Sequence, residues 1–454
     1  MRTAIEHTTV ISVDASDTVY QDATLIFDQD KIVHVGDTQA LKSEIASAQQ
    51  VIDGRNHVVL PGFISAHNHL GYAVFRGRAE DLGYDATQRL YLPMSSVISR
   101  EERQAIGALA IAELLRGGVT TVLEMEEDAD LFAAFIDDVG LRAGIGIMLN
   151  DVNLDELAAG RTVFDEHERD RQLEQAVRLV EQWHGRGEGR LQGYLALTGL
   201  SSSSPSLMKA VREQADLFGV RVSSHLGFGE GELVKRVHGM EQLDYAREHG
   251  LLGDELVAVH CYQLDDDEVQ TLAASGSHLA HCPLMNQFRG EIAAIGDLRA
   301  AGMNVALGID NYFSDYFELL RACIASARIR AQRPDILSAT EVLRLATVNA
   351  ALALGIADEV GSLEAGKQAD LQMVDMRRYG LTPTNNPVQT LVYHAHAKDV
   401  DKVFVAGRQV VDNGVVQGVD ELALIDAAGQ SADDAWQRFA GQHGGYAANA
   451  PSTF

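Results

Sequence analysis

The chain has 454 residues, 46% of them hydrophobic, which is enough for one large domain with a sizeable core and a smaller domain beside it. Its formal net charge is −28, from 65 acidic against 37 basic residues, and no Lys/Arg-rich run interrupts the acidity. This charge argues against nucleic acid and anionic membrane surfaces as partners, and an acidic surface kept for solubility is the simplest interpretation.

The cysteines and the N-terminus indicate the compartment. Cys261, Cys282 and Cys323 form a sparse, odd set without C-x-x-C spacing, so neither a disulfide framework nor a cysteine zinc site is predicted. The first residues, "MRTAIEHTTVISV", contain no apolar segment that follows a basic one, and no uncharged apolar run reaches the length of a membrane span. We therefore expect a soluble, unexported protein in the reducing cytoplasm.

The pattern of apolar and polar residues changes twice along the chain. Residues 1–57 alternate polar and apolar positions in short runs, which predicts a small antiparallel β unit. Residues 58–360 alternate apolar strands with amphipathic helices. The predicted helices are 101–118, 170–185, 204–219 (opened by Ser204-Pro205) and a long one from about Ser314, and the predicted strands are 119–125, 142–149, 191–199, 220–226, 255–261, 277–283 and 304–310.

Repeated strand-helix units indicate a parallel sheet, and their number fits a closed (β/α)₈ barrel better than an open doubly wound sheet. No Gly-rich dinucleotide fingerprint opens any of the helices. Short strands return in 361–420, so we expect both ends of the chain to build one small β-sandwich beside the barrel. Residues 421–454 are expected to form one short helix and a Gly/Ala-rich tail.

Histidines and one aspartate lie at the ends of the apolar runs. "PGFISAHNHL" ends in His67 and His69, whose i, i+2 spacing points both imidazoles to the same side of a strand. Further runs end in His225, His260, His281 and Asp310. A lone histidine in such a place is usually structural, but a shared position at the C-terminal ends of strands is where a parallel barrel places its chemistry. Converging on one point, His67, His69, His225 and Asp310 would suit zinc or another first-row ion.

Several segments in this order resemble the amidohydrolase superfamily, within it the branch of cytosine and S-adenosylhomocysteine deaminases and s-triazine hydrolases such as atrazine chlorohydrolase. They are "LPGFISAHNHL", "AELLRGGVTTVLEM", "VHGMEQLDYAREHGLLGDELVAVHC", "AHCPLMN", "ALGIDN", "LATVNAALALGIADEVGSLEAGKQADL" and "VFVAGRQVV". The resemblance implies a distorted (β/α)₈ barrel, a β-sandwich from both termini, and a mononuclear metal held by His67, His69, His225 and Asp310. It also implies His260 beside the metal-bound water or as a fifth ligand, and a homo-oligomer, a dimer or larger.

The number of metal ions follows from one missing residue. Binuclear members of the superfamily use a bridging lysine from the middle of the barrel, and "LQGYLALTGL" contains none. We therefore expect one divalent metal per chain, zinc first, with iron, cobalt and manganese as alternatives. Zinc lowers the pKa of bound water toward about 7. Asp310 would then take a proton from that water and pass it to the leaving group, while His260 would orient the nucleophile and stabilise charge.

The chain also departs from the family pattern. Ring deaminases of this branch carry H-x-x-E after the fifth strand, but here the glutamate position is Phe228. Glu230 and Glu232 follow within "HLGFGEGE" and could reach back, although solvated loop residues are the simpler interpretation. The Pro-His segment of purine-type members is absent from "LTGLSSSSPSLM", and Met285 replaces the usual serine. The expected substrate-binding residues are Phe228, Glu230, His281 and Asn286.

Three functions are consistent with these observations. The first is a deaminase-like aminohydrolase that displaces amine or halide from a small, flat, nitrogen-rich ring. The second is a metal-dependent hydrolase of an amide, urea or (thio)carbamate, for which the missing glutamate matters little. The third is a non-catalytic structural relative, which the retention of every expected metal ligand argues against. The first is preferred.

Overall fold

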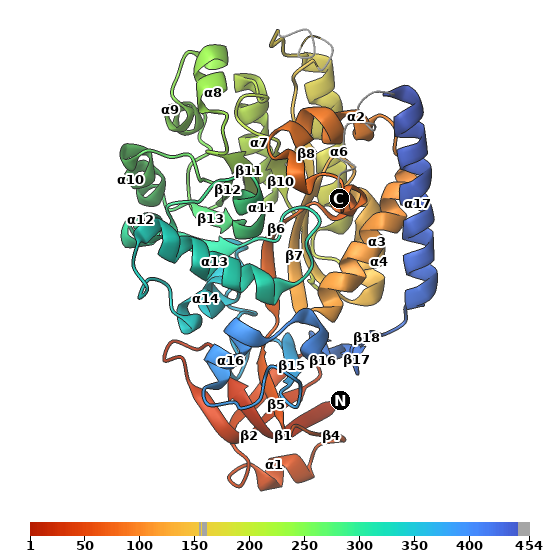
Figure 1. Ribbon diagram of the computed structural model, residues 1–454, viewed down its shortest axis with the longest axis vertical. Coiled ribbons are helices and arrows are strands. Elements are labelled where there is room, and N and C mark those ends of the chain that lie inside the picture. The colour runs from red at the N-terminus through yellow and green to blue at the C-terminus, as the bar shows by residue number, and fades with distance from the viewer. Residues whose placement is uncertain (154–155, 157–160, 444–454) are drawn as a thin grey trace.

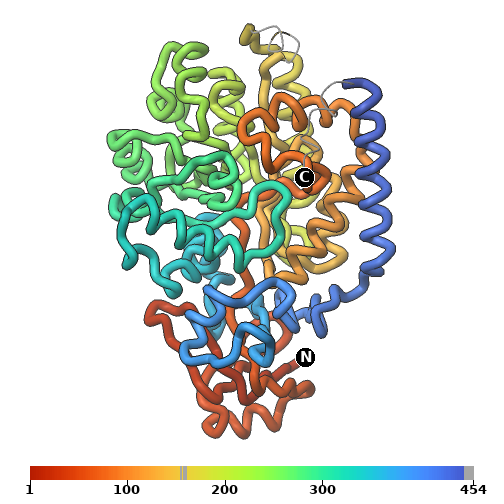
Figure 2. Tube along the Cα trace, in the orientation of Figure 1, coloured from red at the N-terminus to blue at the C-terminus, as the bar shows by residue number. Residues whose placement is uncertain are grey.

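The computed structural model describes residues 1–153, 156 and 161–443. Figure 1 shows a barrel of strands surrounded by helices, with a smaller β unit below it that contains segments from both ends of the chain. In Figure 2 the red N-terminal segment and a blue C-terminal segment lie together in that lower unit. The hydrogen-bonded strands form two sheets, one for each unit.

The barrel sheet is parallel throughout. Its strands are β6 (Phe63–Asn68), β7 (Val119–Glu126), β8 (Arg142–Leu149), β9 (Leu191–Gly193), β10 (Leu195–Leu197), β11 (Val222–Leu226), β12 (Leu256–His260), β13 (His278–His281) and β14 (Asn304–Leu307). The predicted strand 191–199 is divided into β9 and β10, which both pair with β8. A parallel bridge between Asn68 and Asp310 closes the ring between its first and last strands. The predicted (β/α)₈ barrel is confirmed.

Helices cover the outside of the barrel. They are α3 (Arg100–Arg116), α4 (Asp130–Val139), α6 (Glu166–Trp183), α7 (Pro205–Phe218), α8 (Gly231–His238), α9 (Gln242–Glu248), α10 (Asp266–Ala274), α11 (Pro283–Phe288), α12 (Ile295–Ala300), α13 (Tyr316–Ala331), α14 (Ala339–Leu345) and α15 (Val348–Ala353). Two of these helices begin at capping residues. Ser99 caps α3 in a reciprocal capping box with Glu102, and Ser204 caps α7 ahead of Pro205.

The smaller unit is one continuous mixed sheet. Its strands are β1 (Arg2–Ile11), β2 (Val19–Asp28), β3 (Lys31–Asp37), β4 (Gln50–Asp53), β5 (His57–Pro61), β15 (Leu371–Asp375), β16 (Val400–Val405), β17 (Arg408–Asp412) and β18 (Val415–Val416). Strand β5 joins the two ends of the chain, because it pairs with β1 on one side and antiparallel with β15 on the other. The terminal contributions were therefore predicted correctly, and the sheet extends past residue 57 to Pro61.

A buried ion pair ties this sheet to the barrel. Arg142, the first residue of β8, donates to both carboxylate oxygens of Asp370 at 2.9 and 3.1 Å, and both residues are almost fully buried. Breaking such a pair by removing one partner costs about 3–5 kcal/mol. The sheet is thus anchored at the end of the barrel where the strands begin.

The remaining helices are short, except for the last one. They are α1 (Lys42–Ala46), α2 (Leu92–Ser95), α16 (Pro387–His394), η1 (Leu70–Phe75), η2 (Glu80–Leu82), η3 (Thr87–Tyr91), η4 (Ala397–Asp399) and α17 (Glu421–Gln442). The expectation of a short helix after residue 420 was wrong, since α17 has 22 residues and packs along α3. The Gly/Ala-rich tail, 444–454, lies outside the described residues.

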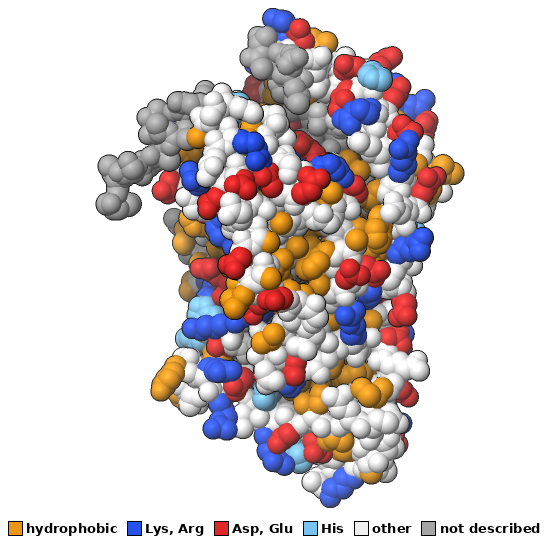
Figure 3. All heavy atoms as spheres, turned by 90° about the vertical axis from the view of Figure 1, so that its right-hand side faces the viewer, with side chains coloured by type: hydrophobic (Ala, Val, Ile, Leu, Met, Phe, Trp, Pro, Cys, Tyr) orange, Lys and Arg blue, Asp and Glu red, His pale blue; other side chains and the backbone are white. Residues whose placement is uncertain are grey.

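The surface agrees with the composition. Figure 3 shows acidic and basic side chains interspersed on the face that carries α17, without an extended basic patch among the residues described there. Within the described part of the chain, no helix has the length and apolar character needed to cross a bilayer.

Candidate metal centre

Strand β7 fixes the turn that carries the H-x-H pair. The ring Nδ1–H of His69 donates to the carbonyl of Met125, which leaves Nε2 of His69 as the free ring nitrogen. On the other face of β7, Glu124 accepts from the backbone N–H of Leu70 at 3.1 Å and Glu126 accepts from that of Gly71. The turn after His69 is thus held by three consecutive residues of one buried strand.

The two glutamates are unusual residues for a fully buried strand. Both are buried, and one carboxylate oxygen of each has no hydrogen-bond partner. Burial, followed by the charge of Glu126, raises the pKa of Glu124, and burial raises the pKa of Glu126 to about 7. Arg103 lies 4.0 Å from Glu126 and opposes that rise. The sequence contained a signal for this pair, because "LEME" places two acids at i, i+2 within an apolar strand.

The residues that close the barrel are also candidate metal ligands. The backbone N–H of Asp310 donates to the carbonyl of His67, and the N–H of His69 donates to the carbonyl of Asp310, each at 3.0 Å. Oδ1 of Asp310 lies 3.6 Å from Nε2 of His67 and 3.8 Å from Nε2 of His69. Gly308 permits this approach, since a Cβ there would lie 2.9 Å from the Cβ of His67.

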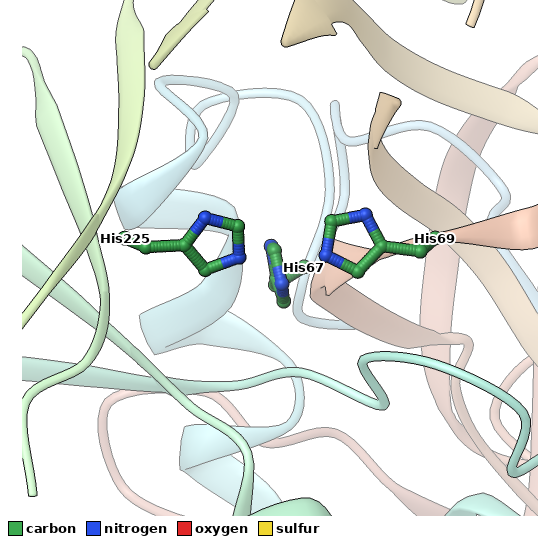
Figure 4. A group of neighbouring side chains, drawn as sticks. All are labelled: His67, His69 and His225. Atoms are coloured by element: carbon green, nitrogen blue, oxygen red, sulfur yellow. The ribbon is translucent and has the colours of Figure 1, made fainter. Parts of the chain in front are cut away.

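His225 comes from the opposite side of the barrel, at the end of β11. Its Nδ1–H donates to the carbonyl of Thr198 at 2.8 Å, so its Nε2 is free as in His69. Figure 4 shows His225 and His69 facing each other across His67, each with a ring nitrogen turned toward the centre. One nitrogen from each of the three rings lies within 4.8 Å of the others.

His260 completes a second overlapping group with His67 and Asp310. Its Nδ1–H donates to Oδ1 of Asn286 at 3.1 Å, which directs Nε2 toward Oδ2 of Asp310, 3.6 Å away. His260 and Asp310 have φ angles of 74° and 71°, in the left-handed region that residues with a Cβ rarely adopt. Such strain costs about 1–3 kcal/mol per residue and is concentrated at functional sites.

The donor set fits a divalent metal. Both ring nitrogens of His67 and Oδ2 of Asp310 are buried without a hydrogen-bond partner, which is costly unless something else binds them. Burial, then the charge of Arg289, lowers the pKa of His67 to about 3, and burial with the neighbouring His67 lowers that of His225 to about 3. The imidazoles are therefore neutral and offer lone pairs, the form in which histidine binds zinc.

The loop after β11 holds Phe228 and Glu230. The Phe228 ring centroid lies 5.5 Å from that of His225 and 6.1 Å from that of His260, so the phenyl group forms one wall of the site. Glu230 is buried, and the expectation of a solvated loop residue is wrong for it; Glu232 is exposed. The Glu230 carboxylate accepts from the backbone N–H groups of Leu200 at 3.1 Å and Ser201 at 2.9 Å.

His281 stands apart from these groups. It is buried at the end of β13 with both ring nitrogens unpartnered, but it belongs to neither cluster of candidate ligands among the described residues. Two further residues near the site escaped the sequence analysis. The Tyr72 ring stacks on His69 with centroids 4.9 Å apart, and Arg289 is a cation whose charge reaches His67.

Comparison with known proteins identifies the family. The model of the amidohydrolase family matches residues 58–410, which is most of the chain. The chain belongs to the amidohydrolase family. This amidohydrolase is 32% identical over 419 residues to 5-methylthioadenosine/S-adenosylhomocysteine deaminase of Moorella thermoacetica, covering 90% of this chain and 94% of that protein. It is 30% identical over 424 residues to 5'-deoxyadenosine deaminase of Methanopyrus kandleri, covering 91% and 95% of the two chains.

Solved structures give the same fold. An adenosine deaminase from Xanthomonas campestris with bound zinc has a TM-score of 0.88 and 28% identity, over 96% of this amidohydrolase and 98% of that chain. Atrazine chlorohydrolase from Arthrobacter aurescens TC1 complexed with zinc has a TM-score of 0.83 at 23% identity, over 95% and 100% of the chains. The predicted superfamily, its deaminase branch and the predicted hydrolase class are confirmed, and the likeness to atrazine chlorohydrolase is one of fold.

Proposed function

We propose that this amidohydrolase is a metal-dependent aminohydrolase that displaces amine, or another leaving group such as halide, from a carbon of a small, flat, nitrogen-rich heterocycle. One observation carries the proposal: three neutral imidazoles and Asp310 converge at the C-terminal end of the barrel with His260 directed at the same aspartate. The relatives named as deaminases of adenosine derivatives support it.

The metal that we propose is one divalent ion per chain, zinc first, with iron, cobalt or manganese as alternatives. Its ligands would be His67, His69, His225 and Asp310. The three imidazoles lie close together, and His67 and Asp310 also have buried polar atoms without a hydrogen-bond partner. When bound, such an ion supplies an acidified water as the nucleophile. The backbone carbonyls that hold His69 and His225 orient both rings before any ligand arrives.

Proton transfer is assigned to Asp310 and His260. We propose that Asp310 accepts the proton of the nucleophilic water and delivers it to the leaving group. The Nε2 of His260, 3.6 Å from Oδ2 of Asp310, would orient the nucleophile and stabilise charge on the attacked carbon. Both side chains are about 98% buried, so little solvent screens their interaction with the nucleophile.

Phe228 favours a second candidate, the hydrolysis of an amide, urea or (thio)carbamate. The phenyl group lies against His225 and His260, where ring deaminases of this branch carry an acid. Glu230 already accepts two backbone N–H groups, so it is not free in this arrangement to replace that acid. Substrates without a ring nitrogen to protonate would not need one.

An activity screen separates the candidates. Zinc-loaded protein is offered aminopyrimidines, aminotriazines, phenylureas and carbamates, and released ammonia or amine is measured. Ammonia from ring amines but not from ureas supports the aminohydrolase, and the reverse supports the second candidate. Inactivity on every class, by protein that retains its metal, would favour a non-catalytic structural relative.

We also propose a cytoplasmic homo-oligomer, a dimer or larger, and a small-molecule substrate as the main partner. The proposed domains are 1–57 with 361–420 for the terminal β unit, 58–360 for the barrel and 421–454 for the C-terminal helix and tail. Light scattering on the purified protein tests the oligomeric state.

A further inference from the structure

The segment between β6 and α3 lies across the C-terminal end of the barrel. We call residues 70–95, from η1 to α2, the covering segment. The Tyr84 hydroxyl donates to Oε1 of Glu291, which follows α11, at 2.8 Å. The Nε–H of Arg76 donates to the carbonyl of Tyr312, which follows β14, at 3.2 Å. A segment that follows the first strand of the barrel therefore reaches the opposite end of the strand order.

The covering segment contacts candidate ligands or their neighbours. The Tyr72 ring stacks on His69, with centroids 4.9 Å apart and planes inclined by 28°. The Tyr91 hydroxyl accepts from Nδ2 of Asn311, the residue after Asp310, at 3.3 Å. His69 is 4% exposed and Asp310 is 1% exposed. The position of the covering segment thus bears on both the alignment of these ligands and their access to water.

Helix α17 holds the covering segment at one residue. The indole Nε1–H of Trp436 donates to the carbonyl of Val74 at 2.9 Å. The indole meets the ring of Phe75 edge to face, with centroids 6.0 Å apart, and Cζ of Arg78 lies 4.4 Å from the indole centroid. Trp436 is buried. In Figure 2 the blue helix α17 lies beside the orange covering segment.

Aromatic contacts lead from Trp436 to the metal centre. The Phe75 ring lies 5.3 Å from the Tyr72 ring and 4.6 Å from the Tyr91 ring, measured between centroids. The two tyrosines also contact each other, at 5.0 Å. Because closely packed rings cannot shift independently, a displacement of Phe75 would disturb both tyrosines. Helix α17 itself lies beyond the range 58–410 that the family model matches.

We propose that Trp436 is a positioning residue for the candidate metal centre, because it fixes η1 so that Tyr72 stays stacked on His69 and Tyr91 stays beside the residue that follows Asp310. This inference rests on the proposed function, since it concerns the same centre. Loss of the Trp436 contacts should let the covering segment open locally, admit water to the buried ligands and speed the release of metal.

Hydrogen exchange on the metal-free protein tests the first step. Trp436→Phe keeps an aromatic ring but removes the indole donor. We expect amide exchange in residues 70–95 to rise about two- to tenfold, the factor that corresponds to one lost hydrogen bond, while β12 exchanges as in the wild type. Leu422→Ala, on the exposed start of α17, is the control and should change neither region. Unchanged exchange in 70–95, or an equal rise in β12, would overturn the inference.

Zinc release tests the second step. Zinc-loaded wild type, Trp436→Phe and Leu422→Ala are mixed with excess EDTA, and the loss of bound zinc is followed with time. Trp436→Phe should lose zinc faster by a similar factor of about two- to tenfold, since the metal leaves through the opened form. Equal rates for all three proteins would mean that the covering segment does not hold the ligands, and would also overturn the inference.

Fluorescence gives a test that does not require a stable Trp436 variant. The chain has two tryptophans, Trp183 and Trp436, so Trp183→Phe leaves Trp436 as the one indole emitter. If Trp436 affects the metal centre, zinc binding must in turn affect the surroundings of Trp436. Its emission should change as zinc is added and level off at one equivalent. An emission spectrum that zinc leaves unchanged would contradict the coupling.

The same measurements separate this inference from the proposed function. Zinc-dependent ammonia release by the wild type, with equal zinc release from wild type and Trp436→Phe, would keep the aminohydrolase and reject the role of Trp436. Faster zinc release and raised exchange in Trp436→Phe, without ammonia from any ring amine, would keep the role of Trp436 and reject the aminohydrolase.

Discussion

Nε2 of His260 lies 3.6 Å from Oδ2 of Asp310, and both residues occupy the left-handed backbone region, His260 at the end of β12 and Asp310 just after β14. The distance is longer than a hydrogen bond and suits two groups that share a third partner. Asn286 fixes one side of the imidazole and the closure of the barrel fixes the aspartate. The strained backbone thus holds the two side chains before substrate binds.

Replacing His260 should separate catalysis from metal binding. His260→Ala should retain metal better than His225→Ala does, yet lose orders of magnitude in kcat, because His260 is assigned to orient the nucleophile and stabilise charge. Elemental analysis and single-turnover rates of both variants measure this. If His260→Ala loses metal as completely as His225→Ala, then His260 is a metal ligand, and the catalytic assignment moves to Asp310 and His281.

Gly308 should be essential for the ligand geometry. A methyl group there would meet the Cβ of His67 at 2.9 Å and Sγ of Cys282 at 3.2 Å, both on crowded backbone segments. Gly308→Ala should therefore displace His67 and lower zinc affinity by about tenfold or more, the scale seen when a residue that orients a ligand is lost. Gly296→Ala, which meets open space in α12, is the matched control and should bind zinc normally. Equal zinc affinity for both variants would refute the role of Gly308.

Substitutions of Phe228 and Glu230 test whether a side chain donates a proton to the substrate. If Phe228 is an apolar wall, Phe228→Glu should raise deamination of aminopyrimidines or aminotriazines and weaken binding of apolar substrates. Glu230→Gln should then be nearly silent in kcat, because the carboxylate bonds to backbone amides. A fall of about 10²-fold or more for Glu230→Gln, as expected when a general acid is removed, would instead make Glu230 the proton donor.

Glu230 should also leave a signature in the pH dependence of stability. Burial raises its pKa from 4.5 to about 7, so the native state favours the protonated carboxyl. Its contribution to the free energy of unfolding is full below pH 4.5 and is lost as the pH rises through about 7. Glu230→Gln, which is always neutral, should gain up to about 3 kcal/mol relative to the wild type across that range.

Urea unfolding at several pH values measures this difference. Glu232→Gln, exposed at the start of α8 two residues after Glu230, is the control and should follow the wild type. A constant difference between Glu230→Gln and the wild type from pH 4 to 8 would mean that Glu230 has the same pKa in the native and unfolded states, and would contradict the raised pKa.

The sequence predicted the parts of this molecule that depend on local periodicity. His67, His225 and His260 end apolar runs, and a parallel barrel brings such ends together, so their convergence could be expected. Ser204-Pro205 marked the start of α7 because capping is local chemistry. The ligand set itself followed from the family resemblance, since spacing alone does not tell a ligand from a structural histidine.

The rest depends on tertiary contacts that a sequence does not display. "GFGEGE" has the composition of a solvated loop. Glu230 is nevertheless buried, because the backbone N–H groups of Leu200 and Ser201 donate to its carboxylate. The length of α17 was missed because its Ala- and Gly-rich sequence is weakly amphipathic, and packing on α3 stabilises it.

Titration of the metal-free protein with zinc tests the central claim most directly. Ammonia release from a ring amine should be absent without metal and rise in proportion to added zinc up to one equivalent per chain, while His67→Ala should not respond. Turnover by the metal-free protein, or a rise that continues to two equivalents, would contradict a single-metal aminohydrolase.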